Sequence, residues 1–489
     1  MSESVRILVL TDAHFSSACA EVPGHPSRQC GMGAELVRRA IEDSRRRGGF
    51  DCLVLLGDMV NDAAAPNVGD DLAAIRQEIE KSAAGVPLLA IPGNHDPRDR
   101  YMEAFGWRPR LDINEYRLIA FADRYEPGDI CTRSEEDRRR LADLAAEAGG
   151  PIVALQHNPM NPAIESDYPY MLTNRQAVLD DYARAGVALS LSGHYHAGQT
   201  LNQAGGVSYL TAPALTEAPY RYAVVSLRGR KVKVEVRPLT VDGEGVVDCH
   251  AHTEFAYCGR GISAAAAVER SRRFGLAGIC LTEHAPQLYC EADDFWEGRH
   301  IKDSRVWRDG GGRIEQFRQE ILPMRDGFAW AGLEVELDAD GQVTVRDEDR
   351  DWPDVLVGAI HFLPQEHKTL DDAQLSRAFM QVYEGLCRGG IDVLAHPWRY
   401  FQRASRRTPT ELYGDLADLL AATGVAAEIN LHINFNDVAF LGQCIARGVK
   451  IALGSDAHAP WEMAAFTAHL DILRQAAGRS DVADLLWRP

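Results

Sequence analysis

The stretch VVDCHAHTEFAYC, residues 246–258, lies near the middle of the 489-residue chain and joins an apolar run to His250 and His252. An earlier stretch, ILVLTDAHF at residues 7–15, has the same form, with one aspartate and one histidine after the apolar run. Imidazole and carboxylate side chains grouped at the end of a strand are typical of metal sites. The chain therefore contains two sequence signals of this kind, and the residues that follow each one indicate the fold of that half.

The size and charge of the chain restrict its class. At 489 residues, two or three domains are expected, and an apolar fraction of 46% is ordinary for globular cores. The formal net charge of −19 argues against a general nucleic-acid binder, because backbone recognition needs concentrated Lys and Arg. An acidic protein can still bind a small anionic substrate where metal cations reverse the local field.

Cysteine usage and hydropathy predict a cytoplasmic protein. The ten cysteines include no CxxC pair, and a chain of this length does not need disulfides to fold. The first apolar run is interrupted by Asp12, which is not the pattern of a signal peptide. No run of about 18 apolar residues predicts a membrane span.

The first half alternates apolar runs with helical stretches, as in an α/β domain whose sheet strands are largely buried. Ser134 is placed to cap one of these helices. The expected strands are 6–12, 51–58, 87–93, 151–157 and 187–193, the expected helices are 34–47, 71–82 and 135–148, and a closing hairpin is expected over 221–239.

A domain boundary is expected in TVDGEGVV, residues 240–247, where two glycines and two acids separate two strand signals. The predicted domains are 1–240 and 246–489. After the boundary, strand and helix signals alternate again, which favours a barrel of the (β/α) kind, and 286–312 reads as an insertion or lid over its site. The expected barrel strands are 245–252, 278–284, 329–337, 354–362, 391–397, 425–431 and 449–456.

Polar clusters in the first half follow the ends of the apolar runs, which is the edge where open α/β sheets bind ligands. A single HxH pair is more often a loop feature, Asp58 alone could cap a helix, and Asn94 alone could make a turn. Five clusters in order are not explained that way, and this mix of oxygen and imidazole suits Zn, Mn or Fe rather than Ca. The clusters contain Asp12, His14, Asp58, Asn94, His95, His157, His194 and His196.

The series D-x-H, G-D, G-N-H-D, H and G-H-x-H resembles the calcineurin-like metallophosphoesterases over about residues 5–240. The resemblance implies a four-layer α/β/β/α sandwich with two metals and a bridging Asp58. By matching position it implies that Asp12, His14, Asp58 and His196 hold one metal and that Asp58, Asn94, His157 and His194 hold the other.

The chemistry implied by this resemblance is phosphoester hydrolysis. Two adjacent cations polarise the phosphoryl oxygens and supply a hydroxide that attacks phosphorus in line. His95, next to a ligand, is the candidate to stabilise or protonate the leaving oxygen. The alternative is that His95 only orients a neighbouring ligand.

In the second half, polar clusters again follow the ends of apolar runs, but they contain other residues. In a βα barrel the ends of the strands form the C-terminal mouth, where such folds carry out chemistry. The clusters contain His250, His252, Glu283, His284, Glu334, His361, His396, Asp456 and His458.

The words DCHAHTEF, LTEHAP and GSDAH resemble the polymerase-and-histidinol-phosphatase (PHP) superfamily, in particular its histidinol-phosphatase-type members, over about residues 246–489. The resemblance implies a distorted (β/α)7 barrel with up to three metals and a catalytic, bridging Glu334. It implies His250, His252, Glu334 and Asp456 for the first metal, Glu334, His361 and His396 for the second, and His284 and His458 for the third.

Cys258 departs from this pattern, because the superfamily commonly has a histidine eight residues after the first histidine of H-x-H. A thiolate ligates zinc well and suits Mn or Mg poorly. The alternative is a small, half-buried cysteine beside a third site that is weak or empty.

Substrate contacts are expected from loops around the barrel mouth. Arg399 follows HPW, and Arg299 and His300 lie in the expected lid. Arginine binds phosphate in a fork geometry, although each of these residues is more often a solvated surface residue. No role is assigned to His25, His367, His432 or His469.

The leading hypothesis is a metal-dependent phosphoesterase with two hydrolytic centres acting on small anionic phosphate esters. It would use Mn, Fe or Zn, two in the N-terminal domain and two or three in the C-terminal domain. A fusion suggests successive steps, with a diester opened in one domain and a monoester removed in the other. The alternatives are a nuclease or DNA-repair phosphoesterase, disfavoured by the charge, and a regulatory barrel that binds metal or ligand without turnover. The oligomeric state is left open.

Overall fold

A computed structural model describes residues 4–18, 21–22, 25–363, 370–433 and 436–489. The chain divides into two compact units, Met1–Leu239 and Thr240–Pro489. The division falls at the glycine-containing segment that follows the closing hairpin. Among the described residues, no helix is both long and apolar enough to cross a membrane.

Unit 1 is built on two mixed sheets. The five-stranded sheet has the order β15-β14-β1-β4-β5, and the six-stranded sheet has the order β12-β13-β11-β10-β7-β6. The five predicted strands and the predicted hairpin all form. Their bounds are β1 Val5–Leu10, β4 Cys52–Leu55, β5 Leu88–Ala90, β10 Ile152–Leu155, β11 Val187–Ser192, β14 Arg221–Arg228 and β15 Lys231–Pro238, and the others are β6 Arg110–Ile113, β7 Tyr116–Ala120, β12 Gln199–Ala204 and β13 Val207–Thr211.

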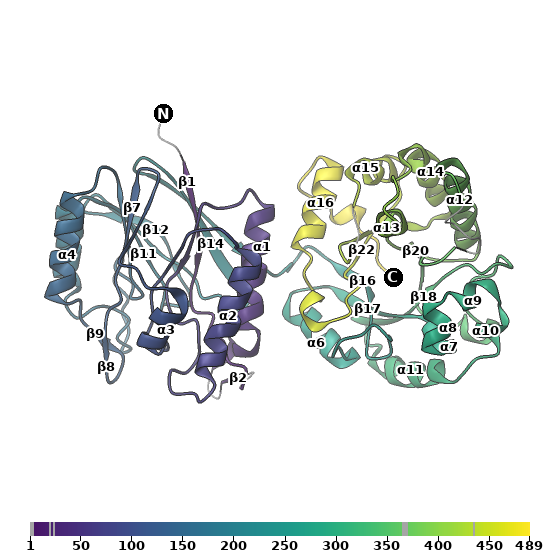
Figure 1. Ribbon diagram of the computed structural model, residues 1–489, viewed down its shortest axis with the longest axis horizontal. Helices are drawn as coiled ribbons and strands as arrows, with labels where there is room; N and C mark the ends of the chain where they lie inside the picture. The colour runs from purple at the N-terminus through teal and green to yellow at the C-terminus, as the bar shows by residue number, and fades with distance from the viewer. Residues whose placement is uncertain (1–3, 19–20, 23–24, 364–369, 434–435) are drawn as a thin grey trace. The chain divides into compact units, whose positions relative to one another are not determined.

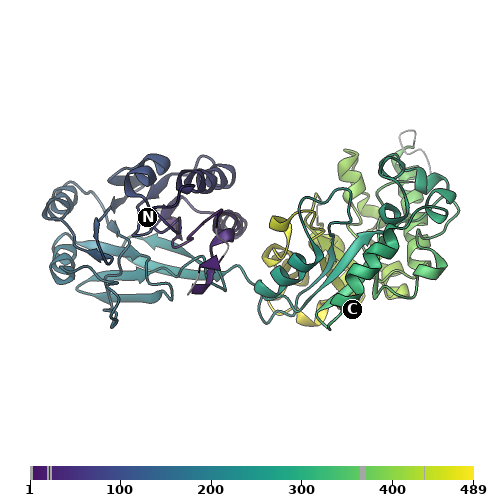
Figure 2. The ribbon, with the colours of Figure 1, turned by 90° about the horizontal axis from the view of Figure 1, so that it is seen from below.

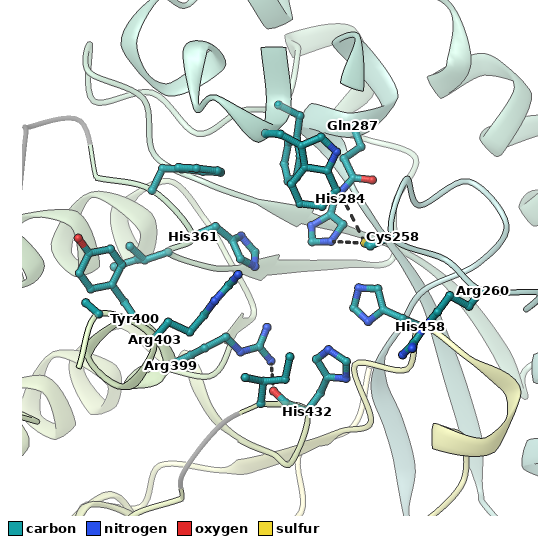
Figure 3. Close-up of a pocket in the computed structure, with 16 residues that line it drawn as sticks. Cys258, Arg260, His284, Gln287, His361, Arg399, Tyr400, Arg403, His432 and His458 are labelled. Carbon is teal, nitrogen blue, oxygen red and sulfur yellow. Dashed lines mark hydrogen bonds between the residues drawn. The ribbon is translucent and has the colours of Figure 1, made fainter. Parts of the chain in front are cut away.

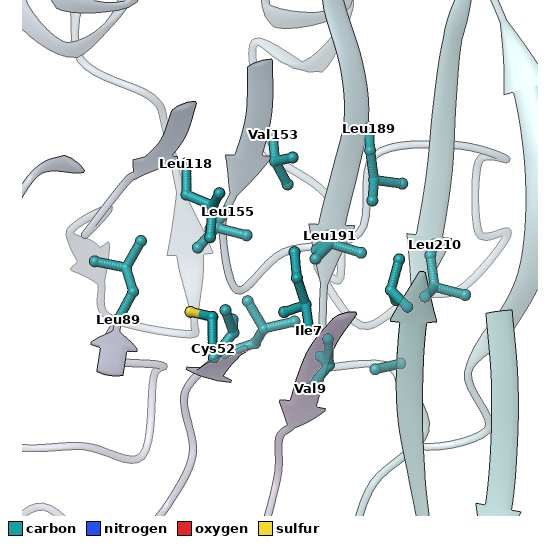
Figure 4. Close-up of a cluster of buried hydrophobic side chains, with 14 of the residues drawn as sticks. Ile7, Val9, Cys52, Leu89, Leu118, Val153, Leu155, Leu189, Leu191 and Leu210 are labelled. Carbon is teal, nitrogen blue, oxygen red and sulfur yellow. The ribbon is translucent and has the colours of Figure 1, made fainter. Parts of the chain in front are cut away.

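The core of unit 1 lies between the two sheets. Ile7 and Val9 of β1 pack in one apolar cluster with Leu155 of β10 and Leu191 of β11 (Figure 4). The alternation of side chains along each strand explains this, since every second residue points to the same face. The β1, β4 and β5 strands are mutually parallel, as are β7, β10, β11 and β13, so polar residues that follow these strands gather at common sheet edges.

The predicted helices of unit 1 are present as α1 (Gly33–Arg46), α2 (Val68–Ser82) and α4 (Glu135–Ala146). Ser134 caps α4, and its side chain accepts a hydrogen bond from Asp137 N at 3.1 Å. A second apolar cluster joins α4 and α5 (Arg175–Arg184) to the six-stranded sheet.

A buried ion pair stands beside this second cluster. Arg133 is almost fully buried and donates from Nε and Nη2 to Asp123 at 2.5 and 2.9 Å, while its guanidinium lies 3.7 Å from the ring centre of Phe121. Asp123→Ala should destabilise unit 1 by about 3–5 kcal/mol, because it leaves a buried charge without its partner. Hydrogen exchange of unit 1 peptides across a urea series measures this. Asp112→Ala, which removes a partly exposed pair with Arg117, is the control and should cost about 1 kcal/mol or less. A similar loss in both variants would contradict the argument.

Unit 2 is a closed barrel of seven strands, and all seven predicted strands form. Neighbouring strands are parallel, and pairing of the first strand with the last closes the barrel. The strands are β16 Val247–Ala251, β17 Gly278–His284, β18 Ala329–Val335, β19 Val355–Gly358, β20 Val393–Leu394, β21 Ala426–Asn430 and β22 Ile451–Gly454.

Helices surround these strands in Figure 1, and Figure 2 shows the same barrel from the side. The segment predicted as an insertion contains four short helices between β17 and β18: α7 Ala285–Tyr289, α8 Ala292–Trp296, α9 Arg299–Lys302 and α10 Arg305–Arg308. The longer helices are α6 Ala264–Arg273, α11 Arg313–Ile321, α12 Asp372–Arg388, α14 Tyr413–Thr423, α15 Val438–Ala446 and α16 Thr467–Ala477.

Candidate metal centres

The polar clusters of unit 1 meet at the carboxyl ends of its parallel strands. Asp12 and His14 follow β1, Asp58 follows β4, His157 follows β10, and His194 follows β11. All five side chains are buried. The topology therefore brings together residues that lie up to 182 positions apart in the sequence.

Asp58 occupies the middle of this cluster. Its Oδ2 atom lies 3.8 Å from His14 Nε2 and 3.2 Å from His157 Nε2. On one side, His14 Nε2 is 3.1 Å from His196 Nε2. On the other, Asp58, His157 and His194 place one potential ligand atom each within 4.8 Å of one another, and Asp12, His14 and His196 form a second such group. One carboxylate between two groups is the arrangement that a bridging ligand needs.

Several buried atoms in the cluster have no hydrogen-bond partner among the described residues. They include His14 Nδ1, Asn94 Oδ1 and His194 Nε2. A buried polar atom without a partner costs about 1–3 kcal/mol, so a native protein rarely leaves several of them together. These atoms are oxygens and imidazole nitrogens that can ligate transition metals, and the site therefore fits a metal of this class.

The neighbouring carboxyl groups orient the ligands. Asp96 accepts backbone N–H bonds from Asp58 at 2.7 Å, Met59 at 3.0 Å and Gly93 at 2.8 Å, which fixes the loop after β4. A Cβ at Gly93 would lie 2.1 Å from Asp58 Oδ1, so the loop can approach this closely only with glycine. Glu217 accepts a 2.8 Å bond from His196 Nδ1. Such partners set the tautomer of a ligating imidazole.

His95 lies beside the cluster rather than within its centre. Its backbone N–H donates to Asp58 Oδ1 at 2.8 Å, and its Nδ1 donates to Asn61 O at 2.7 Å. Its ring stands edge-on to His14, with 4.7 Å between ring centres. This position is compatible with both interpretations of His95, leaving-group contact and orientation of a ligand.

The imidazoles of the cluster differ in their proton affinity. Burial opposes charge on His157, but the adjacent Asp58 carboxylate outweighs it and raises the pKa of His157 to about 9. Burial, followed by the proximity of His157, lowers the pKa of His194 to about 3. A metal needs neutral imidazole nitrogens, so at His157 a proton competes with the metal at neutral pH.

Tyrosines that the sequence reading did not assign form one wall of this cluster. The rings of Tyr168 and Tyr170 lie 5.6 and 5.3 Å from that of His194, and Tyr168 Oη accepts a 3.4 Å hydrogen bond from Asn94 Nδ2. Their only signal is the tyrosine pair in SDYPY, which carries no metal pattern. Aromatic faces at this place can contact flat groups of a substrate.

Glu334, at the end of β18, is the centre of the cluster in unit 2. Its Oε2 lies 2.6 Å from His284 Nδ1 and 3.5 Å from His250 Nε2, and its Oε1 lies 3.2 Å from His396 Nε2 and 3.6 Å from His361 Nε2. Burial opposes ionisation of Glu334, but the surrounding imidazoles hold its pKa well below the usual range. The group is therefore an anion that contacts potential ligands on several sides.

Asp456, after β22, completes this cluster. Its Oδ1 lies 3.0 Å from His252 Nε2 and 3.6 Å from His458 Nδ1. His250, His252 and Asp456 form one group with ligand atoms within 4.8 Å, and His252, His284 and His458 form another. The converging atoms are carboxylate oxygens and imidazole nitrogens, so this cluster again fits a transition metal.

Cys258 is placed beside the second of these groups. Its Sγ lies 3.9 Å from His284 Nε2 and accepts a weak bond from Gln287 Nε2 at 3.8 Å. Burial would raise the pKa of this thiol, but the contacts with His284 lower it overall. The thiol is thus within reach of the imidazoles predicted for a third metal.

Three buried glutamates support the ligands of unit 2, and only Glu283 stood in a predicted cluster. It accepts a 3.0 Å bond from His252 Nδ1. Glu428 accepts a 2.9 Å bond from His250 Nδ1, and Glu336 pairs with His361. Carboxylate-to-imidazole contacts of this kind orient metal ligands. The signal for Glu428 and Glu336 was an acid inside an apolar strand, which is costly unless the charge is paired.

The three predicted substrate contacts have different places. Arg399 lies at the pocket described below, and its Nη2 donates to Asp456, to Asn430 Oδ1 at 3.0 Å and to His432 O at 2.8 Å. Arg299 is a half-exposed surface residue bound to Asp294 and Glu297 at 2.6 Å. His300 is buried and lies 2.9 Å from Glu336. Neither Arg299 nor His300 is among the described residues that line the pocket, and a substrate contact by either stays a prediction.

A pocket of about 600 Å³ opens over the cluster in unit 2 (Figure 3). His284, His361 and His458 form its polar floor. His432, for which no role was predicted, also lines the pocket and stacks on His458 with ring centres 4.7 Å apart. His367 lies outside the described residues. The remaining lining residues are Cys258, Arg260, Gln287, Phe295, Trp296, Ile360, Phe362, Arg399, Tyr400, Arg403, Ala404 and Ile433.

Comparison with known proteins identifies the class of unit 1. Residues 5–198 match the family described as Calcineurin-like phosphoesterase. Together with the mixed sheets and the buried ligand cluster, this match shows that the N-terminal part of the chain contains a calcineurin-like metallophosphoesterase domain. The chain is accordingly a phosphoric ester hydrolase.

Two relatives carry names in this class. A Deinococcus radiodurans protein named "Probable histidinol-phosphatase" is 26% identical over 272 residues, covering 48% of this chain and 95% of its own length. A Synechococcus protein named "Probable cyclic nucleotide phosphodiesterase" is 30% identical over 173 residues, covering 34% of this chain and 64% of its own length. The first relative and the closed seven-stranded barrel are consistent with a PHP domain in unit 2.

Solved structures were also compared. A dimetal phosphatase from Danio rerio matches 48% of this chain and 98% of its own, with a TM-score of 0.39 and 16% identity. A Plasmodium protein described as GAP50, the anchor in the inner membrane complex, matches 48% of this chain and 84% of its own, with a TM-score of 0.34 and 11% identity.

Proposed function

We propose that this protein is a metal-dependent phosphoesterase with two hydrolytic centres, one at Asp58 and one at Glu334. The observation that carries the proposal is the same in both units: a buried carboxylate lies between groups of imidazoles whose ligand atoms converge within 4.8 Å. The family match of unit 1 and the phosphatase and phosphodiesterase names of the two relatives support it. The substrates are small phosphate esters.

In the N-terminal centre, Asp12, His14, Asp58 and His196 would hold one metal, and Asp58, Asn94, His157 and His194 the other. The pair would polarise the phosphoryl group and activate the attacking water. The chain itself holds the ligands in place through Asp96 and Glu217. His95, whose ring touches that of His14, would donate a proton or hydrogen bond to the leaving oxygen.

In the C-terminal centre, His250, His252, Glu334 and Asp456 would hold the first metal, and Glu334, His361 and His396 the second. His284, His458 and Cys258 would hold a third, for which the thiolate favours zinc. Arg399 reaches both the pocket and Asp456, so it would position a ligand and contact a phosphoryl oxygen.

The two centres belong to folds that we propose in finer detail as a four-layer α/β/β/α sandwich over 1–240 and a distorted PHP-type (β/α)7 barrel over 246–489. Mn, Fe or Zn would serve both, with two ions in the first and two or three in the second. A cytoplasmic location, and a sequence in which a diester is opened at one centre and the monoester is removed at the other, remain predictions.

Metal content and a substrate panel test the proposal together. Purified native protein should contain four or five transition metals per chain, whereas about two would indicate one loaded centre. The panel offers cyclic nucleotides, nucleotides and sugar phosphates to the wild type and to His95→Asn and His361→Ala. Each variant should lose activity on a different class of ester. Full activity of both variants on every accepted substrate would refute two centres, and a salt-sensitive shift of single-stranded DNA would instead favour a nuclease.

A further inference from the structure

The charged side chains that line the pocket over the C-terminal cluster are all cationic among the described residues. Among the described residues that line it, Arg260, Arg399 and Arg403 are cations, and none is an aspartate or glutamate. The buried acids of the cluster lie beneath the floor and are engaged by histidines. A bound molecule therefore meets positive charge at the walls and no carboxylate from a described lining residue.

Arg403 is the cation that is free to act on a ligand. Arg399 Nη2 is engaged by Asp456, and Arg260 Nη2 donates to Glu462 at 3.0 Å. The side chain of Arg403, at the end of α13 (Arg399–Arg403), makes no ion pair or hydrogen bond with any residue in the described ranges. In Figure 3 its side chain points toward His361 at the floor of the pocket. Its guanidinium can therefore form a fork with an anionic group of a substrate.

The pocket also has apolar and aromatic lining residues. Phe295, Trp296, Phe362 and Tyr400 line it together with Ile433. Trp296 and Ile433 are 52% and 66% exposed, which is unusual for side chains of this size at a concave site. Exposed apolar surface in a pocket marks a binding site, and aromatic side chains favour flat rings as partners.

We infer that this pocket takes phosphomonoesters of aromatic alcohols that are neutral or carry a second anionic group, and that it rejects phosphorylated amino alcohols. The inference deepens the proposed function and rests on it, because the imidazole floor would hold the phosphoryl group. Trp296 and its aromatic neighbours bind the ring, and Arg403 sets the charge preference. An ammonium on the alcohol part would face Arg403 without a carboxylate on the described walls to pair with.

The reaction is ordinary hydrolysis. A bond forms between a water oxygen and phosphorus, and the bond between phosphorus and the aryl oxygen breaks. The proton that the water loses ends on the aryl oxygen, so the products are a phenol and inorganic phosphate.

Three para-substituted phenyl phosphates vary the charge of the alcohol part: 4-methylphenyl, 4-(carboxymethyl)phenyl and 4-(aminomethyl)phenyl phosphate. The methylene group separates each charge from the ring and keeps the leaving groups similar. The full chain carrying Asp58→Asn is used, so that the N-terminal centre does not contribute. The kcat/KM for 4-(aminomethyl)phenyl phosphate should be roughly tenfold or more below that for 4-methylphenyl phosphate. The kcat/KM for 4-(carboxymethyl)phenyl phosphate should equal or exceed that for 4-methylphenyl phosphate. A kcat/KM for the aminomethyl ester equal to or above that of the methyl ester overturns the inference while leaving the proposed function intact.

Variants then assign the preference to residues. Arg403→Ala should raise KM for the carboxymethyl ester and compress the difference between the three esters. Arg407→Ala is the matched control, because this arginine is half exposed and bound to Glu411, and it should change nothing. An unchanged order of esters in Arg403→Ala overturns the role of Arg403.

Trp296 is tested in the same background. Trp296→Ala should raise KM for all three aryl esters but not for ethyl phosphate, and Trp296→Phe should restore most of the loss. An equal rise in KM for the aryl esters and for ethyl phosphate overturns the proposal that Trp296 binds the ring. Failure of the Asp58→Asn chain to hydrolyse any of these aryl esters overturns this inference, whereas the proposed C-terminal centre fails only if that chain hydrolyses no phosphate ester of the wider panel.

Discussion

Glu334→Gln is expected to lower phosphomonoester turnover at the C-terminal centre by roughly 10³-fold or more. The carboxylate lies within 3.6 Å of His284, His250, His396 and His361, and both of its oxygens are used. Glutamine keeps the shape but removes the charge and replaces one acceptor by a donor that faces imidazole nitrogens. The measurement is kcat and kcat/KM on an aryl phosphate, with metal content determined on the same preparation.

The control is Glu348→Gln, the same change at an exposed position of unit 2. It should leave rates and metal content unchanged. If Glu334→Gln kept its metals and more than about a tenth of its activity, a bridging role for Glu334 would be untenable.

Asp58→Asn should have a comparable effect on the N-terminal centre, with phosphodiester turnover reduced roughly 10³-fold or more. Asp58 Oδ2 lies between His14 and His157, and an amide there cannot serve as an anionic bridge. Asparagine is the proper substitution because Asp58 has a φ of +53°, a region that asparagine adopts more readily than most residues. Loss of activity would then report on charge rather than on a displaced loop.

Asp70→Asn, at an exposed position in the first turn of α2, controls for the change of charge. The two active-site variants should also separate by substrate. Asp58→Asn should retain the monoester activity that Glu334→Gln loses, and the reverse should hold for the diester. Parallel loss of both activities in either variant would argue for a single shared centre.

The strand-end clusters could be predicted from the sequence because parallel strands bring their carboxyl ends to one edge. Asp12 and Asp58 follow runs that pair as the parallel strands β1 and β4, and His157 follows β10 of the other sheet, which packs against the first and brings His157 to Asp58. The same reasoning placed Glu334 and Asp456 at one end of the barrel. The strands identified in this way have as their signal a continuous stretch of hydrophobic residues that ends at a polar cluster.

The remaining features depend on information that local patterns lack. β6, β7, β12 and β13 are short or partly polar, and their place in the sheet is set by long-range pairing. Glu428 and Glu336 were missed because their histidine partners come from other strands. Arg299 and His300 were predicted only from their place in the expected lid, because the direction of side chains in a segment of short helices cannot be read from composition.

Six of the residues proposed as ligands have left-handed backbones: Asp12, His14, Asp58, His194, His396 and Asp456 all have φ between +28° and +67°. This conformation costs side-chain-bearing residues of order 1 kcal/mol or more each, and glycine adopts it freely. The consequence is evolutionary. In lineages where the chemistry is no longer selected, glycine at these positions would relieve strain and increase stability, so these six sites should drift before the cores that surround them. Aspartate and histidine kept at these strained positions among relatives would then record continued selection for catalysis, separately in each half of the chain.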